Sequence, residues 1–139
     1  NLNPPIDPIE NTKFFVNNVA ATFEKDINFY RAALMSAEHL RLFDPRIPDG
    51  LFWRAQQLAA PNKEWYERGL LLGNIEPSII MRKVHNGNRL ARIDWVLGYI
   101  DLSQFRHQVI KSILLVYAAD ASPELHARLS EEINKLNSL

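Results

Sequence analysis

The side chains that could carry out chemistry are scattered along this chain rather than gathered into motifs. No two of the four histidines stand three or four residues apart, so no pair can share one helical face and bind a metal: His39, His85, His107 and His126. Neither Glu38 nor Glu124 has the Glu-x-x-His spacing of di-iron helical bundles. We therefore expect no metal site.

Nucleophilic catalysis needs a nucleophile, a base beside it and a third group that orients the base. The chain has no cysteine, which excludes thiol catalysis, zinc thiolates and disulfides. No serine lies in a nucleophile-elbow sequence, and Ser103 and Ser122 are explained by helix starts. The five glycines form no phosphate-binding loop. The sequence favours a protein without catalytic activity or a cofactor.

Asp94 is the most interesting single carboxylate, because it stands beside Trp95 in a largely apolar stretch. A buried carboxylate needs a partner, and Arg89 and Arg92 are near in the sequence. A structural ion pair therefore explains Asp94 better than a role in general acid–base catalysis does.

The one regional charge bias is basic, although the formal net charge of the chain is zero. Four cations surround Asn86-Gly87-Asn88: Arg82, Lys83, Arg89 and Arg92. We expect them to form a solvent-facing patch that contacts an acidic protein partner. A helix-turn-helix is disfavoured because the second helix would be rich in core-type residues, which leaves little face for a DNA groove. Nucleic acid is therefore not the expected partner.

These side chains need a scaffold, and the first part of it is a long amphipathic helix. Residues 1–7 are a proline-rich, extended lead-in, and Asp7 and Glu10 form a capping-box pattern at the start of the helix. From there to Phe43 the sequence contains no glycine. Apolar residues then recur with spacings of four and three: Val16, Ala20, Phe23, Ile27, Tyr30, Leu34 and Ala37. A kink or break stays open, because one helix of this length would span about 50 Å.

This spacing predicts that three side chains of the seam are buried: Phe23, Ile27 and Leu34. Replacement of Ile27 by alanine would then cost about 2–5 kcal/mol, from the lost transfer free energy and the cavity left behind.

The middle of the chain predicts short elements. Two helices are expected, over 51–60 and 63–72, with Gly69 at a close helix contact inside the second. Residues 78–96 fit two helices that meet at Gly87, with Asn88 as a cap, or a short β-hairpin over 79–96 with Asn86-Gly87 as its turn. The two-helix interpretation is favoured because the flanking segments are helical.

The helix expected over 102–119 is apolar nearly all round in its second half. Such a helix is either central in the core or half-covered by a partner. In the second case, Leu115 and Tyr117 would contact another chain. A last helix is expected to begin after Ser122, and no apolar run is long enough to span a membrane.

The sequence as a whole predicts one all-α domain over 1–139, an irregular bundle of five or six helices with a long N-terminal helix. The two members of an adjacent aromatic pair cannot both face one core, and the sequence has three such pairs: Phe14-Phe15, Phe52-Trp53 and Trp65-Tyr66. These pairs favour a binding role. The expected function is a non-catalytic module, an adaptor or assembly subunit, that binds another protein chain or a second copy of itself.

The main alternative is a small-ligand sensor domain of a membrane-anchored receptor, suggested by the proline-rich entry and the long first helix. An enzyme and a nucleic-acid-binding domain are further alternatives. The chain begins at Asn1 rather than methionine, so we expect a processed form or a piece of a longer protein. Its compartment stays open between the cytoplasm and the exterior.

Overall fold

The structure is a computed structural model that describes residues 4–43 and 61–139. These residues contain six α-helices: α1 (Pro8–Glu24), α2 (Ile27–Phe43), α4 (Lys63–Glu67), α5 (Pro77–Val96), α6 (Leu102–Ala118) and α7 (Pro123–Asn137). Extended pairing within the described ranges amounts to one isolated bridge between Leu71 and Ala121. The all-α fold class is confirmed. The helix expected over 51–60 lies outside the described residues.

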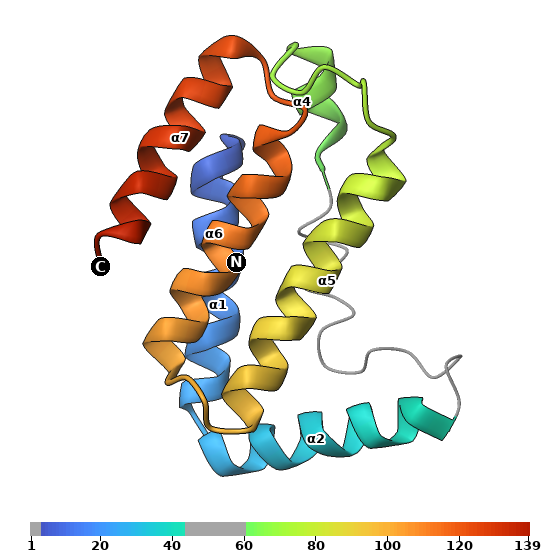
Figure 1. Ribbon diagram of the computed structural model, residues 1–139, viewed down its shortest axis with the longest axis vertical. Helices are drawn as coiled ribbons and strands as arrows, with labels where there is room; N and C mark the ends of the chain where they lie inside the picture. Colours follow the sequence, from blue (N-terminus) through green and yellow to red (C-terminus); the bar gives the residue numbers. More distant parts are fainter. Residues whose placement is uncertain (1–3, 44–60) are drawn as a thin grey trace.

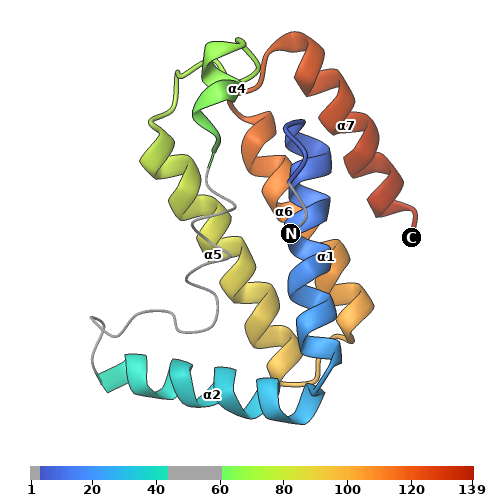
Figure 2. The same ribbon diagram turned by 180° about the vertical axis from the view of Figure 1, so that it is seen from behind.

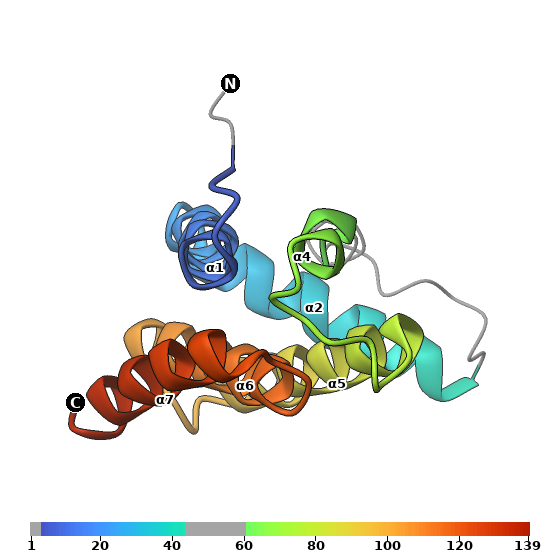
Figure 3. The same cartoon turned by 90° about the horizontal axis from the view of Figure 1, so that it is seen from above.

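The helices form two layers and a crosspiece. α5, α6 and α7 lie side by side in one layer, and α1 and α4 lie on one face of it (Figure 3). α2 runs crosswise at the end of the bundle where α1 ends (Figures 1 and 2). α6 is the central element, because it packs against α1, α5 and α7.

Local capping interactions start α1 and α6 where the sequence predicts. The Asp7 carboxylate accepts hydrogen bonds from the backbone N–H groups of Ile9 and Glu10, each at 3.1 Å. Asp101 and Gln104 form the complete capping box of α6, with both bonds at 2.8 Å. Each cap satisfies N–H groups that a helix start leaves without partners.

The core is centred on α6, which explains its apolar second half. Its buried side chains face α1, α5 and α7: Phe105, Val109, Ile110, Ile113, Leu114 and Tyr117. A second aromatic group fills the end of the bundle near α2, where Phe23 stacks on Trp95 with ring centroids 4.9 Å apart. α6 is therefore central in the described part of the fold, while a contact of its exposed side with another chain stays a prediction.

The long N-terminal helix is broken into two. α1 ends at Glu24, and Asp26 caps α2 by accepting a hydrogen bond from the Phe29 N–H at 3.2 Å. Asp26 thus supplies a start signal that competes with continuation of the helix.

The break changes which residues of the seam are buried. Phe23 and Leu34 are buried as expected, but Ile27, the first residue of α2, is 37% exposed. The expectation for Ile27 was wrong because α2 turns across the bundle at this point. Its replacement by alanine should therefore cost less than the replacement of a core leucine.

Residues 77–96 form one continuous helix, so both the two-helix and the β-hairpin interpretations were wrong. Gly87 lies inside α5 because α6 comes close there. A Cβ atom built on Gly87 would overlap Ser112 Oγ and lie 3.1 Å from Ser112 Cβ. The glycine therefore serves helix packing, and α5 offers no second helix for a helix-turn-helix.

The close contact expected at Gly69 is absent. α4 ends at Glu67, and Gly69 follows it with a φ of +72° and no atom within 4 Å of an added Cβ. Leu70 N–H then bonds back to the Trp65 carbonyl oxygen at 2.8 Å. Gly69 is thus the left-handed residue that stops α4.

The Gly87 contact yields a first prediction. In an exposed helix, Gly87→Ala would stabilise the protein by about 1 kcal/mol. Because the new methyl group overlaps Ser112, we expect a net loss of about 1–3 kcal/mol in the free energy of unfolding, measured by urea titration.

The double variant Gly87→Ala with Ser112→Ala should recover part of that loss, because it removes the nearest overlapping atom. Asn86→Ala, an exposed change on the same helix, is the matched control and should change stability by less than about 0.5 kcal/mol. A Gly87→Ala variant as stable as wild type would show that α5 and α6 are not closely packed.

Candidate functional site

The feature that fixes α2 on the bundle is an ion-pair cluster of Glu38 with Arg89 and Arg92, called the Glu38 cluster below. Arg92 of α5 is only 1% exposed, and its Nη2 donates to Glu38 Oε1 at 3.2 Å. Arg89 binds the same carboxylate through Nη2 at 2.8 Å and through Nε at 3.2 Å from each oxygen. Two guanidinium groups of α5 therefore bind one carboxylate of α2.

The electrostatics of this cluster favour the ionised carboxylate. The Arg89 hydrogen bond is the largest influence, and it lowers the pKa of Glu38 below its ordinary value of 4.5. Burial acts in the opposite direction, while the charges of both arginines and the Arg92 hydrogen bond lower the pKa further. Glu38 is thus held as an anion by its structural partners, which is poor chemistry for a general base.

Two further contacts hold α2 against α5. The Arg31 guanidinium lies over the Trp95 ring, with Cζ 5.1 Å from the ring centroid. Leu34, one turn before Glu38, is buried in the core. These contacts combine cation–π attraction with apolar burial along the side of α2 that meets the bundle.

The angle between α2 and α5 contains a small apolar cavity of about 90 Å³, called the α2–α5 cavity below. Two of its lining residues are the ion-paired Glu38 and Arg92. The other five are apolar: Leu34, Met35, Ile93, Val96 and Leu97. Met35 and Leu97 at its margin are 49% and 52% exposed. The cavity therefore opens among apolar side chains at the surface.

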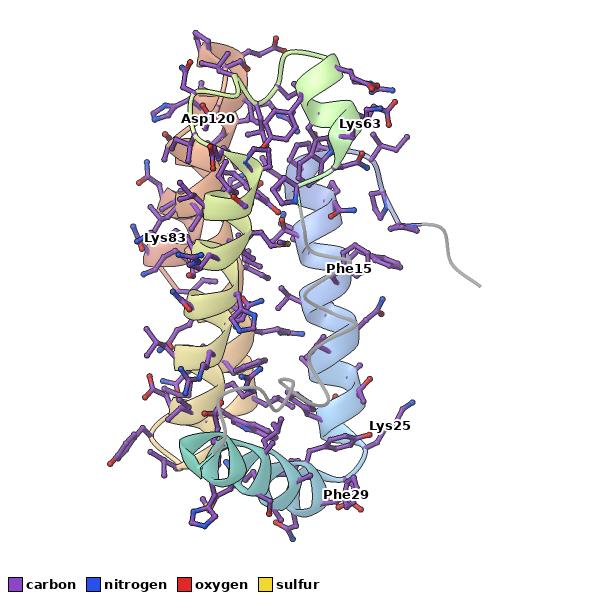
Figure 4. All side chains as sticks on the ribbon, turned by 90° about the vertical axis from the view of Figure 1, so that its right-hand side faces the viewer. Phe15, Lys25, Phe29, Lys63, Lys83 and Asp120 are labelled. Atoms are coloured by element: carbon purple, nitrogen blue, oxygen red, sulfur yellow. The ribbon has the colours of Figure 1, made fainter. Side chains whose placement is uncertain are left out.

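The basic residues of α5 divide into two groups. Arg82 and Lys83 are exposed, and Lys83 lies on the side of α5 away from α1 (Figure 4). Arg89 is half-exposed and Arg92 is buried, both bound to Glu38. The expectation that all four cations face solvent was wrong for Arg92, because Glu38 draws it into the interface. A partner contact by the others stays a prediction.

Asp94 does not have the partner expected for it. It is half-buried and forms no ion pair with a residue in the described ranges, whereas both nearby arginines bind Glu38. The buried carboxylate is instead Asp120, which accepts hydrogen bonds from the N–H groups of Gly73 and Asn74 at 3.0 and 3.1 Å. Asp120 thus has a structural role in joining the α4–α5 loop to the end of α6.

The two apolar residues expected at a partner contact have different environments. Leu115 is 51% exposed on the outer side of α6. Tyr117 is buried, with its ring edge-on to Trp65 at 5.3 Å, and burial raises the pKa of its hydroxyl. The expectation that Tyr117 is uncovered was therefore wrong, because it points into the core. A contact of Leu115 with another chain stays a prediction.

A second hollow, of about 160 Å³, lies between α6 and the end of α7. It has a mainly polar lining: Gln104, His107, Gln108, Lys111, Leu136 and Leu139. Lys111 Nζ donates to Asn137 Oδ1 at 3.0 Å, so this cation already has a partner within the fold.

Neither a metal-binding group nor a membrane-spanning helix is found in the part of the chain that the structure describes. No group of three or more histidine or acidic side chains there is placed to hold a metal ion. None of the described helices is long and apolar enough to cross a membrane. Comparison with protein families, curated proteins and solved structures finds no match to this chain.

The sequence held one signal for this site that pattern reasoning missed. Glu38 follows Leu34 by one helical turn, so it falls on the buried side of its helix. A carboxylate in that position requires a cationic partner. Arg89 and Arg92 are the only two arginines of the sequence that stand three residues apart, which places them on one side of a helix. The α2–α5 cavity itself leaves no such signal, because it arises from the crossing of two helices.

The Glu38 cluster yields a prediction for stability against pH. Because the folded-state pKa of Glu38 is lowered, its contribution is fully present above the ordinary value of 4.5 and is lost as the pH falls through the folded-state pKa. At neutral pH, Glu38→Gln should reduce the free energy of unfolding by about 2 kcal/mol, because a buried guanidinium loses its carboxylate.

Urea titrations between neutral pH and pH about 3 would measure this difference, which should shrink below pH 4.5. Glu64→Gln is the matched control, since Glu64 pairs with Arg68 at 2.7 Å on the surface and should change stability by less than about 0.5 kcal/mol. A pH-independent gap between wild type and Glu38→Gln would contradict the assigned role of the carboxylate.

Proposed function

We propose that this protein is a non-catalytic helical module that binds another protein chain at the surface where α2 meets α5. The α2–α5 surface consists of the apolar margin of the cavity and the neighbouring cations of α5: Met35, Ile93, Leu97, Arg82 and Arg89. The observation that carries the proposal is the α2–α5 cavity, an apolar hollow with exposed apolar side chains around it.

The arrangement of α5 supports a surface larger than the cavity alone. Ile79, Leu90 and Leu97 are all exposed, and their spacings of 11 and 7 residues are close to whole numbers of helical turns. They therefore lie along one side of α5 that continues from the margin of the cavity. Apolar side chains in a row at a helix surface are typical of contacts with a partner helix or peptide.

The way α2 is held supports the same function. A helix that crosses the end of the bundle buries only part of its surface, and Phe29 and Met35 remain exposed on it. Figure 4 shows Phe29 on α2 at the end of the bundle. Nevertheless, the Glu38 cluster and the Arg31–Trp95 contact fix α2 in place. A fixed surface loses little conformational entropy on binding, which favours affinity.

The proposal predicts a binding defect that leaves the fold intact. Peptides selected from a displayed random library on the wild-type protein should bind Met35→Glu at least about tenfold more weakly, because a carboxylate at the cavity margin must be desolvated. Thermal denaturation should show that Met35→Glu remains folded, since the side chain is half-exposed.

Leu72→Glu is the matched control, because Leu72 is 52% exposed but lies outside this surface. Its binding to the selected peptides should equal that of wild type. Enrichment of no peptide, or peptides that bind Met35→Glu as well as they bind wild type, would contradict the proposed function.

A further inference from the structure

We propose that the partner segment is acidic and that it inserts one aliphatic side chain, of leucine or methionine size, into the α2–α5 cavity. This inference rests on the proposed function and specifies its partner. It follows from the size of the cavity, the chemistry of its walls and the charge of the helix beside it.

The size of the cavity selects the inserted side chain. An apolar cavity of about 150 Å³ in another protein accommodates benzene. The α2–α5 cavity, at about 90 Å³, is smaller, so a compact aliphatic group fills it better than an aromatic ring does. It matches a branched or linear aliphatic group, while an alanine methyl would leave most of it empty.

The walls of the cavity select an apolar group over a polar one. Five of the seven lining residues are leucine, isoleucine, valine or methionine. The remaining two, Glu38 and Arg92, bind each other at 3.2 Å. An aliphatic group that entered would gain by leaving water, because most of the wall is apolar.

The charge of α5 selects the residues that flank the inserted side chain. α5 carries four cations and one acid: Arg82, Lys83, Arg89 and Arg92 against Asp94. Arg82, Arg89 and Val96 succeed one another at intervals of seven residues, so they share one side of α5. Val96 lines the cavity, which places exposed Arg82 and half-exposed Arg89 on the approach to it. Acidic residues in the partner complement this side.

The inference is tested with synthetic peptide arrays whose members differ at two features. One central position is leucine, tryptophan or alanine, and the flanking positions are glutamate, glutamine or lysine. Fluorescently labelled protein should bind best to peptides with glutamate flanks and a central leucine. Alanine or tryptophan at the centre should weaken binding at least about tenfold, and added salt should weaken it as well.

Arg82→Glu should reduce binding of the glutamate–leucine peptides about three- to fivefold without loss of folding. Arg82 is suitable because it is exposed and takes no part in the Glu38 cluster. Lys63→Glu, an equal charge change at an exposed side chain of α4, is the matched control and should leave binding unchanged.

The outcomes separate this inference from the function on which it rests. Equal binding of lysine-flanked or tryptophan-centred peptides would overturn it. Library peptides that bind the α2–α5 surface but are neutral would also overturn it, while the proposed function would stand. A dimer mass by light scattering that Met35→Glu reduces to a monomer mass, with no peptide bound, would replace the acidic partner by self-association.

Discussion

The buried guanidinium of Arg92 is the constraint on which the position of α2 depends. Removing a charged group from water is costly, and the cost is offset only when a partner of opposite charge satisfies it. Glu38 of α2 is that partner, at 3.2 Å, and Arg89 binds the same carboxylate. α2 therefore has to lie across the end of α5, and the α2–α5 cavity is the space that this crossing leaves between the two helices.

Contacts elsewhere in the bundle allow α2 to cross α5. The start signal at Asp26 ends the continuous course of the N-terminal segment, which allows α2 to turn. Phe23 and Trp95 stack where four helices meet, and Arg31 packs over the same indole ring. Gly87 lets α5 lie close to α6, within a helix that continues past Arg92 to Val96. The proposed binding surface thus depends on packing along the whole length of α5.

Several features of the fold that depend on neighbouring residues were predictable from the sequence. Asp101 and Gln104 cap each other three residues apart, and Ser122 accepts from Leu125 N–H at 3.2 Å. Features that depend on distant residues leave only weak signals in the sequence. The sequence predicts a helix stop at Gly87, because it does not show that Ser112 faces this glycine. The sequence predicts a surface cation at Arg92, because its partner Glu38 lies 54 residues earlier.

The central claim is that the Glu38 cluster holds α2 in one position across α5. The chain has no cysteine, so spin labels can be attached at Ala32→Cys on α2 and Asn86→Cys on α5, both exposed. Electron–electron double resonance would then report the distance between the two helices. The account predicts one narrow distance distribution in the otherwise wild-type protein and a broad one when Glu38→Gln is added. A broad distribution with Glu38 present, or an equally narrow one without it, would contradict the account.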